Sequence, residues 1–272
     1  MELRQVDLGD SGKLEYQTVG AGRDLIILHS LLSAAEHYAD LAGRLSDTWR
    51  VHLVHLPGFG GSDAVPAPDI RHYAERLLAA LDRIAPEGAD LMGNGFGGFV
   101  AGATAARAGS RIGRLALVDT GSSFPEAGRA AFTGMARAVE AGGMERIVET
   151  ALDRLFPAEF IAADPETAER ARKSLLAMDP VHFATACRTL ETLDLDEEVA
   201  GIAAETLVLS GTLDTATPPA MGRALAGRIP GARYEELPGV GHAPHLQAPG
   251  VLAERLREFL AGAPAGREAR AS

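Results

Sequence analysis

The sequence predicts an α/β protein with a mostly parallel, eight-stranded sheet, helices on both faces and an inserted region of helices. Short continuous apolar runs, typical of strands that are covered on both faces, alternate with amphipathic helical patterns over 25–119. This alternation indicates parallel strands that are joined by helices. Strand patterning is then absent from 124–203 and returns at 206–209 and 232–237. We therefore expect a helical segment inserted into an α/β core.

The division of the chain follows from this pattern. The parts that carry strands form the expected core, and the strand-free stretch between them forms an expected helical cap. The tail is small and polar and is expected to be disordered. The expected parts are a core of residues 1–123 and 204–262, a cap of 124–203 and a tail of 263–272.

The first two strands differ in pattern from the others. They alternate apolar and polar residues on either side of Asp10-Ser11-Gly12, which is typical of an antiparallel hairpin. The later strands are short apolar runs followed by glycine, proline or polar residues. The expected strands are 3–8, 13–19, 25–28, 51–54, 89–92, 115–119, 206–209 and 232–237.

Helices are expected where apolar residues recur with a period near 3.6. Within 124–203 these patterns are separated by breaks such as Gly142-Gly143 and Asp164-Pro165. The expected helices are 33–45, 69–84, 96–108, 126–141, 144–155, 165–178, 181–193 and 249–260.

Length and charge limit the class of partner. The chain has 272 residues, which suits one domain with an inserted lid, and a formal net charge of −11. That charge argues against nucleic acid or an anionic membrane as a partner, because both attract positive charge. We expect a small-molecule substrate and neither a cofactor nor a metal, and a homodimer stays open. The N-terminus lacks an apolar signal core, and the chain has a single cysteine, which together favour a cytoplasmic location. That cysteine, Cys187, lies in a helical pattern, which favours a buried thiol.

The stretch 90–98 reads Asp-Leu-Met-Gly-Asn-Gly-Phe-Gly-Gly and joins an expected strand to an expected helix by a sharp turn. In a Gly-x-Ser-x-Gly nucleophile elbow, small residues two positions to either side of the nucleophile let the strand and the helix approach each other. Gly93 and Gly97 are those small residues, so the nucleophile position is Gly95. Glycine has no side chain that can attack a carbonyl group.

The same stretch also fits the dinucleotide-binding pattern Gly-x-Gly-x-x-Gly through Gly93, Gly95 and Gly98. The free amides at a helix N-terminus attract phosphate. However, the stretch does not follow the first strand of the chain. No acidic residue ends a strand some twenty positions later unless Asp119 takes that role. We therefore favour the nucleophile elbow.

Local motifs and their order resemble the α/β-hydrolases with a helical cap. His29-Ser30-Leu31 stands where that family has its His-Gly-x oxyanion loop, and 56–63 matches its Pro-Gly-x-Gly-x-Ser loop. The turn 210–214 resembles the one that bears the triad acid, and 239–245 resembles the loop that bears the triad histidine. The stretch 90–98 is similar to the elbow of meta-cleavage-product hydrolases and 3-oxoadipate enol-lactonases, except for the missing serine.

The resemblance implies a site in which Asp214 and His242 form an acid–base pair. Imidazole takes up and returns a proton near neutral pH, and an acidic partner orients the ring. Both residues follow strands at the edge where open α/β sheets place their sites. The backbone amides of Leu31 and Phe96 are the expected oxyanion hole, and these donors do not depend on the residue at position 95.

Three other polar residues lie in or near these motifs. Asp119 also follows a strand and is an alternative acid, although a helix or turn cap is its expected role. His55 stands where relatives commonly carry aspartate and is expected to be structural, as is His245.

The expected function is hydrolysis of a small ester, enol-lactone or vinylogous diketone, with activity reduced by Gly95. Two explanations of Gly95 stay open. The chain is a Ser-to-Gly variant of an active enzyme, or the glycine is native. With a native glycine, either the pair of Asp214 and His242 activates water or the protein binds a ligand without turnover. Gly95→Ser is expected to raise turnover at least about a hundredfold.

Two alternatives remain beside the hydrolase. A cofactor-free oxygenase would use the histidine as a base without a nucleophile, and a receptor would bind a ligand without turnover. An anionic substrate would need one or two of the basic residues in 124–203 to point inward. These basic residues are Arg129, Arg137, Arg146, Arg154, Arg170, Arg172, Lys173 and Arg188.

Overall fold

The computed structural model describes residues 1–262, and the expected disordered tail lies outside them. Eight strands form one sheet in the order β1-β2-β4-β3-β5-β6-β7-β8. β1 and β2 form the expected hairpin, β2 is also antiparallel to β4, and the remaining neighbours are parallel. The strands are β1 Glu2–Asp7, β2 Lys13–Val19, β3 Arg23–Leu28, β4 Trp49–Val54, β5 Ala89–Asn94, β6 Ile112–Val118, β7 Glu205–Gly211 and β8 Arg233–Leu237.

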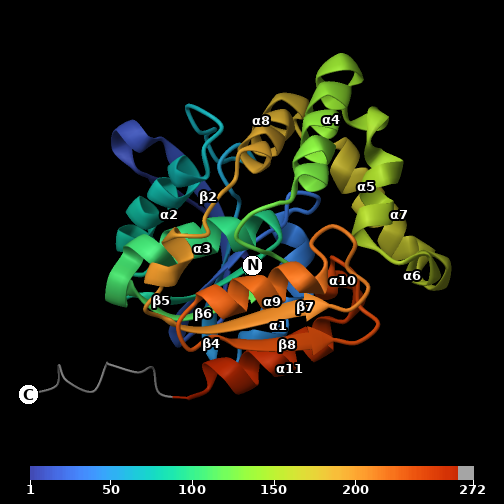
Figure 1. The fold of residues 1–272 in the computed structure, drawn as a ribbon. Coiled ribbons are helices and arrows are strands. Elements are labelled where there is room, and N and C mark those ends of the chain that lie inside the picture. The colour runs from blue at the N-terminus through green and yellow to red at the C-terminus, as the bar shows by residue number, and fades with distance from the viewer. Residues whose placement is uncertain (263–272) are drawn as a thin grey trace, which may run out of the picture.

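Helices cover both faces of the sheet, as the alternating pattern predicts (Figure 1). The expected helix at 33–45 is divided into a 3-10 turn, Ala35–Tyr38, and α1. The helices before β6 and after β7 are α1 Ala39–Leu45, α2 Ile70–Ile84, α3 Phe96–Ala108, α9 Pro219–Arg228, α10 Pro244–Gln247 and α11 Pro249–Leu260.

Successive side chains of β3 show how the sheet separates two apolar cores. Leu25 and Ile27 pack on the side of α1 and α11, with residues such as Leu252. Ile26 and Leu28 point to the opposite face and pack on the side of α2 and α3. Because side chains of a strand alternate between faces, a continuous apolar run is what a strand buried on both sides requires.

The segment between β6 and β7 contains helices and no strand among the described residues, as its sequence pattern predicts. Ser123 and Asp194 form a single antiparallel bridge near its two ends. α4 packs against α8, and α5 packs against α7. In the view of Figure 1 these helices lie above the sheet. The helices are α4 Glu126–Gly142, α5 Val148–Leu155, α6 Ala158–Ala163, α7 Pro165–Leu176 and α8 Pro180–Glu191. The division into core and cap remains a prediction.

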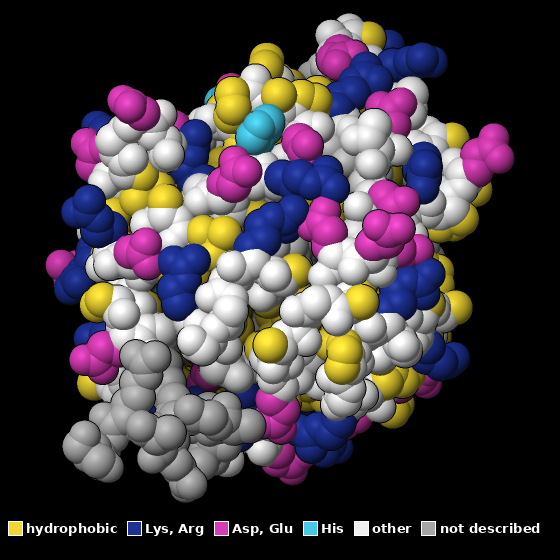
Figure 2. Space-filling view, turned by 60° about the vertical axis from the view of Figure 1, so that its left-hand side comes forward, with side chains coloured by type: hydrophobic (Ala, Val, Ile, Leu, Met, Phe, Trp, Pro, Cys, Tyr) yellow, Lys and Arg dark blue, Asp and Glu magenta, His cyan; other side chains and the backbone are white. Residues whose placement is uncertain are grey.

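Charged side chains of both signs are interspersed on the face of the molecule shown in Figure 2. Arginines form ion pairs with acidic side chains, for example Arg188 with Glu140 and Arg228 with Asp196. None of the helices in residues 1–262 is long and apolar enough to cross a membrane.

The turn between β5 and α3 has the shape of a nucleophile elbow. Gly95 adopts φ 53° and ψ −118°, a conformation that glycine adopts more readily than other residues. An ideal Cβ on Gly93 would lie 2.2 Å from the carbonyl oxygen of Gly97, and one on Gly97 would lie 2.4 Å from that of Leu28. The small residues therefore let α3 begin directly against the end of β3.

Gly97→Ala is expected to lower the free energy of unfolding by about 3 kcal/mol or more, because the new methyl group would meet backbone atoms that cannot move aside. Gly102→Ala in the same helix is the matched control. Its Cβ would meet the nearest atom, of Val199, at 4.0 Å, so it is expected to be neutral or stabilising. Urea unfolding measures both variants. Equal stabilities of the two variants would contradict the close approach at Gly97.

Candidate active site

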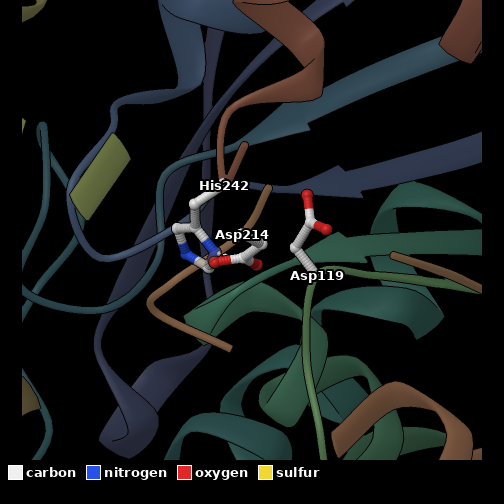
Figure 3. A group of neighbouring side chains, drawn as sticks. All are labelled: Asp119, Asp214 and His242. Carbon is white, nitrogen blue, oxygen red and sulfur yellow. Dashed lines mark hydrogen bonds and ion pairs between the residues drawn. The ribbon is translucent and has the colours of Figure 1, made fainter. Parts of the chain in front are cut away.

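Asp214 and His242 form a hydrogen-bonded pair at the carboxyl edge of the sheet. Asp214 follows β7 and His242 follows β8, and these parallel strands are neighbours. His242 Nδ1 lies 2.8 Å from Asp214 Oδ2, and both residues are buried. Figure 3 shows the carboxylate of Asp214 facing the imidazole ring. The structure therefore brings together the two residues that the sequence pairs.

Three further hydrogen bonds hold the carboxylate of Asp214 in place. Its Oδ1 accepts from the amides of Ala216 at 2.7 Å and Thr217 at 3.0 Å, and its Oδ2 accepts from the Thr217 hydroxyl at 2.7 Å. Burial opposes ionisation, but His242 and these donors lower the pKa of Asp214 below its ordinary value. Asp214 is therefore charged at neutral pH. Sequence reasoning missed Thr217, whose signal is its place three residues after the acid in a turn.

The imidazole of His242 is oriented as a base toward the elbow. Burial favours the neutral ring, but the charge of Asp214 and its hydrogen bond to the ring raise the pKa of His242 above its ordinary value. Because the Nδ1–H group of His242 donates a hydrogen bond to Asp214, Nε2 is left as the basic nitrogen. An ideal Cβ on Gly95 would lie 2.8 Å from Nε2. The free nitrogen thus faces the space above the nucleophile position.

Asp119 is not a helix or turn cap, which corrects the sequence-based expectation. It is also not the carboxylate paired with His242, in agreement with the choice of Asp214 as the acid. It follows β6, and its Oδ1 accepts from the amide of Gly211 at the end of β7 at 2.7 Å. Its Oδ2 is buried without a hydrogen-bond partner among the described residues. Burial and the nearby charge of Asp214 raise the pKa of Asp119 to about 8, so it is neutral at pH 7.

Asp119, Asp214 and His242 lie close enough together for their nitrogen and oxygen ligand atoms to be within 4.8 Å of one another. Figure 3 shows Asp119 beside the pair. Both oxygens of Asp214 and the Nδ1 of His242 are already used in hydrogen bonds. These residues therefore fit a hydrogen-bonded network better than a cation site.

Asp119→Asn is expected to raise the free energy of unfolding more at pH 8 than at pH 5. The unfolded carboxyl group loses its proton near pH 4, whereas the folded one keeps it to about pH 8. The folded state therefore binds more protons in this range, and the unaltered chain loses stability as pH rises. Asparagine keeps an acceptor for Gly211 and cannot ionise. Urea unfolding at both pH values measures the difference, with the exposed Asp153→Asn as control; an equal gain at both values would contradict the buried neutral carboxyl.

The backbone amides of Leu31 and Phe96 have no hydrogen-bond acceptor among residues 1–262. Phe96 is the first residue of α3, where helical amides lack a partner within the helix. Leu31 lies in the turn that follows β3. Both residues line the same cavity as Gly95 and His242. They are placed where the resemblance puts the donors of an oxyanion hole.

Ser30 lies against His242, a contact that sequence reasoning missed. Its Oγ is 3.3 Å from His242 Nε2, and an ideal Cβ on Gly95 would lie 2.6 Å from the same Oγ. The hydroxyl group therefore occupies room that a side chain at position 95 would need. The signal in the sequence is a serine at the second position of His29-Ser30-Leu31, where the His-Gly-x loop has glycine.

Buried hydrogen bonds hold the backbone of Ser30. The amide of Leu56 donates to His29 Nε2 at 3.1 Å, so His29 Nδ1 donates to the Ser30 carbonyl at 2.9 Å. Burial lowers the pKa of His29 to about 3, which keeps this ring neutral. The Ser30 amide donates to the Tyr38 hydroxyl at 3.3 Å, and that hydroxyl donates to Asn94 Oδ1 at 2.7 Å. The loop after β3 is thus tied to the strand that leads into the elbow.

The cavity above Gly95 has about 360 Å³ of space outside the protein atoms, which includes space open to the solvent. Residues from the core and from α4, α5 and α8 enclose it, so the helical segment forms its roof. Most of the lining side chains are apolar, among them Phe96, Phe99, Phe124, Phe132, Met135 and Leu190.

Arg154 of α5 is the basic residue of the helical segment that lines this cavity. It is partly buried, and no acidic side chain lies within ion-pair distance of it in the described part of the chain. Its guanidinium lies 6.0 Å from the ring centroid of Phe132. Burial lowers the pKa of Arg154, but an arginine stays protonated at physiological pH. Within residues 1–262, the cavity therefore holds a cation that no carboxylate reaches at ion-pair distance, although the charge of Asp214 also acts on it.

The other residues considered from the sequence lie outside this cavity. His55 is buried with its Nε2 3.3 Å from Glu36 Oε1. His245 stacks on Tyr38, with ring centroids 3.9 Å apart, and its Nε2 is 3.1 Å from Ser33 Oγ. Burial raises the pKa of Cys187 to about 12, so it is a thiol rather than a thiolate. All three fit the structural roles expected from the sequence.

Comparison with known proteins agrees with this fold. A family model described as the alpha/beta hydrolase family matches residues 25–255. The chain belongs to the α/β-hydrolase family. The eight-stranded, mostly parallel sheet of the chain is the architecture that its sequence predicts.

Individual relatives resemble the chain over nearly its whole length. It is 31% identical to the polyketide synthase ThaQ of Burkholderia thailandensis over 98% of the chain, although it spans 13% of that protein. It is 30% identical to the pimeloyl-[acyl-carrier protein] methyl ester esterase of Chromobacterium violaceum over 91% of the chain and 98% of that protein. The crystal structure of the enol-lactonase from Burkholderia xenovorans LB400 matches with a TM-score of 0.88 and 28% identity, over 93% of the chain and 98% of that structure.

Proposed function

We propose that this chain is a hydrolase and that it cleaves a small ester or lactone that carries a carboxylate or a similar anionic group. The observation that carries the proposal is the arrangement around one cavity. His242, paired with Asp214, lines this cavity, and so do Leu31 and Phe96, whose backbone amides have no acceptor among residues 1–262. Acyl transfer needs a base for the attacking group and donors for the oxyanion, and the cavity presents both.

The resemblance to an enol-lactonase and to a methyl ester esterase supports the same reaction class. An enol-lactone is a cyclic ester, so both names describe attack on an ester carbonyl. A carbonyl group in the cavity would direct its oxygen at the two amides and its carbon toward Nε2 of His242. Cleavage of a vinylogous diketone would use the same base and the same donors.

Arg154 supports an anionic substrate. A guanidinium inside an apolar cavity without an acidic partner is costly unless a ligand supplies the charge. Of the basic residues in the helical segment, Arg154 meets the requirement that one of them points inward. A substrate with one carboxylate would pair with Arg154 while its apolar part fills the space between the phenylalanine side chains.

Steady-state hydrolysis of carboxylate-bearing esters and enol-lactones, each beside its neutral methyl ester analogue, tests the proposal. We expect hydrolysis that is faster for the carboxylate member of each pair. Oxygen consumption with a hydroxyquinolone-type substrate and no hydrolysis would instead favour the cofactor-free oxygenase. Tight binding of these compounds without any turnover would favour a receptor.

Arg154→Met is expected to raise KM for carboxylate-bearing substrates by about 10-fold to 100-fold, since a charge-assisted hydrogen bond contributes about 1.5–3 kcal/mol. Its effect on the neutral analogues is expected to be small. The matched control is Arg137→Met in α4, which removes an exposed arginine. The measurement is KM for each pair of substrates. An equal rise for charged and neutral substrates would mean that Arg154 supports packing rather than charge recognition.

A further inference from the structure

The hydroxyl group of Ser30 takes up the place next to His242 that a nucleophile would use. Its Oγ lies 3.3 Å from His242 Nε2, the nitrogen that Asp214 leaves free. A Cβ at position 95 would lie 2.6 Å from this Oγ, which is closer than two such atoms can approach. A side chain at position 95 and the present Ser30 hydroxyl therefore exclude each other unless one of them moves.

We propose that Ser30 is the nucleophile of this hydrolase, so that the nucleophile has moved from the elbow to the loop after β3. The proposal rests on the function proposed above, because it uses the same base and the same oxyanion donors. It also accounts for Gly95: a glycine at the elbow leaves room for the hydroxyl group that comes from the neighbouring loop.

The three side chains form the relay that a nucleophilic serine requires. Asp214 Oδ2 accepts from His242 Nδ1 at 2.8 Å, and His242 Nε2 is then the acceptor for the Ser30 hydroxyl at 3.3 Å. The longer of these distances is usual for a site without bound substrate. All three residues are buried, so water competes little for these hydrogen bonds.

The oxyanion donors suit a nucleophile at either position. In the usual elbow the nucleophile at 95 works with the next amide along the chain, that of Phe96, and with the amide of Leu31 from the other loop. With Ser30 as the nucleophile, the next amide along the chain is that of Leu31, and Phe96 supplies the second donor. The two loops exchange roles, and both amides still line the same cavity.

Hydrogen bonds on both sides of Ser30 hold its backbone. Its carbonyl oxygen accepts from His29 Nδ1 and from the amide of Ser33, at 2.9 Å and 3.1 Å. Its amide donates to the Tyr38 hydroxyl at 3.3 Å. The amide of Gly97 in α3 donates to the carbonyl of His29 at 3.1 Å, which ties the loop to the elbow helix. The hydroxyl group is thus positioned by rigid elements.

The reaction proceeds in two steps. In the first, Ser30 Oγ forms a bond to the ester carbonyl carbon and its proton passes to His242 Nε2. The tetrahedral oxyanion, held by the amides of Leu31 and Phe96, collapses and expels the alcohol or enol oxygen, which takes the proton from His242. In the second, water attacks the acyl-Ser30 ester and gives a proton to Nε2. That proton returns to Ser30 Oγ as the carboxylic acid leaves.

Labelling with a fluorophosphonate tests the proposal on the unaltered chain. A nucleophilic serine displaces fluoride from phosphorus and keeps the phosphonyl group, which tandem mass spectrometry assigns to one residue of the tryptic peptide 24–44. We expect the label on Ser30 and none on Ser33, the other serine of that peptide. Label at another serine, or no label, would overturn the proposal.

Ser30→Ala is expected to lower kcat/KM for the preferred ester or lactone by about 10³ or more, because a triad without its nucleophile retains only binding and oxyanion stabilisation. Ser33→Ala is the matched control: Ser33 lies on the same loop and is bonded to His37 and His245 rather than to His242. It is expected to keep kcat/KM within about threefold. Equal activity of Ser30→Ala and the unaltered chain would overturn the proposal.

The failure of this proposal differs from a failure of the proposed function. If the unaltered chain is inert and unlabelled while a Ser30→Gly/Gly95→Ser double variant hydrolyses the substrates, the site is a hydrolase site and Ser30 is not its nucleophile. If the double variant is inert as well, the proposed hydrolysis itself is wrong.

Discussion

Asp214→Asn is expected to lower kcat for ester or lactone hydrolysis by about 10³-fold to 10⁴-fold, with a small effect on KM. Asparagine can donate its amide hydrogen to His242 Nδ1, which favours the tautomer with the proton on Nε2. That nitrogen then points a hydrogen at Ser30 instead of accepting its proton. The loss also removes the charge that raises the pKa of His242.

The matched control for this substitution is Asp153→Asn, which neutralises an exposed acid of α5 outside the cavity. It is expected to leave both kinetic constants unchanged. Steady-state kinetics with a carboxylate-bearing lactone measures the two variants. A loss confined to KM in Asp214→Asn would show that Asp214 helps to shape the cavity rather than to orient His242.

The Ser30→Gly/Gly95→Ser double variant is expected to exceed Gly95→Ser alone in turnover by about a hundredfold or more. The structure changes the expectation for the single variant, since a Cβ at position 95 would lie 2.6 Å from Ser30 Oγ and 2.8 Å from His242 Nε2. Glycine at position 30 removes the first of these contacts and leaves His242 free to accept a proton from a serine at the elbow.

Comparison of kcat/KM among the unaltered chain, Gly95→Ser, Ser30→Gly and the double variant measures this coupling. If the two positions act independently, the effects of the single substitutions multiply, and the double variant falls well below Gly95→Ser. We expect strong coupling instead, with Ser30→Gly the least active. A Gly95→Ser variant that already matches the double variant would show that Ser30 moves aside without cost.

The elements with a clear periodic pattern were predictable from the sequence, whereas the short ones were not. The small-residue helix after the elbow was expected at 96–108, and α3 has these bounds. By contrast, α6 was missed, because a helix of six residues between two prolines, Pro157 and Pro165, is too short to show a period of 3.6. The expected helix at 33–45 begins instead as a 3-10 turn.

The pairing of Asp214 with His242 was predictable because the order of strands determines which loops meet at the carboxyl edge of the sheet. Contacts between loops were not predictable in the same way. The position of Ser30 against His242 depends on how closely the loop after β3 approaches the elbow, which a pattern of residue types does not measure. For the same reason, the sequence does not distinguish Arg154, which lines the cavity, from the arginines around it.

The environment of Asp119 was also out of reach of the sequence. Its place after a strand suggested either a second acid for the histidine or a cap. The structure shows that its carboxyl group is buried beside Asp214, where two charges would repel each other. The protonation state of such a group depends on burial and on neighbours in space, not on its neighbours in the chain.

Hydrolysis of a carboxylate-bearing enol-lactone by the unaltered chain and by His242→Ala tests most directly whether His242 is the base of a working hydrolase site. We expect hydrolysis by the unaltered chain to be faster than the reaction in buffer, and kcat/KM of His242→Ala to be lower by a factor of at least about 10³. The circular dichroism spectrum of the variant is expected to match that of the unaltered chain. Hydrolysis at the same rate by both proteins, or at the buffer rate by both, would contradict this role of His242.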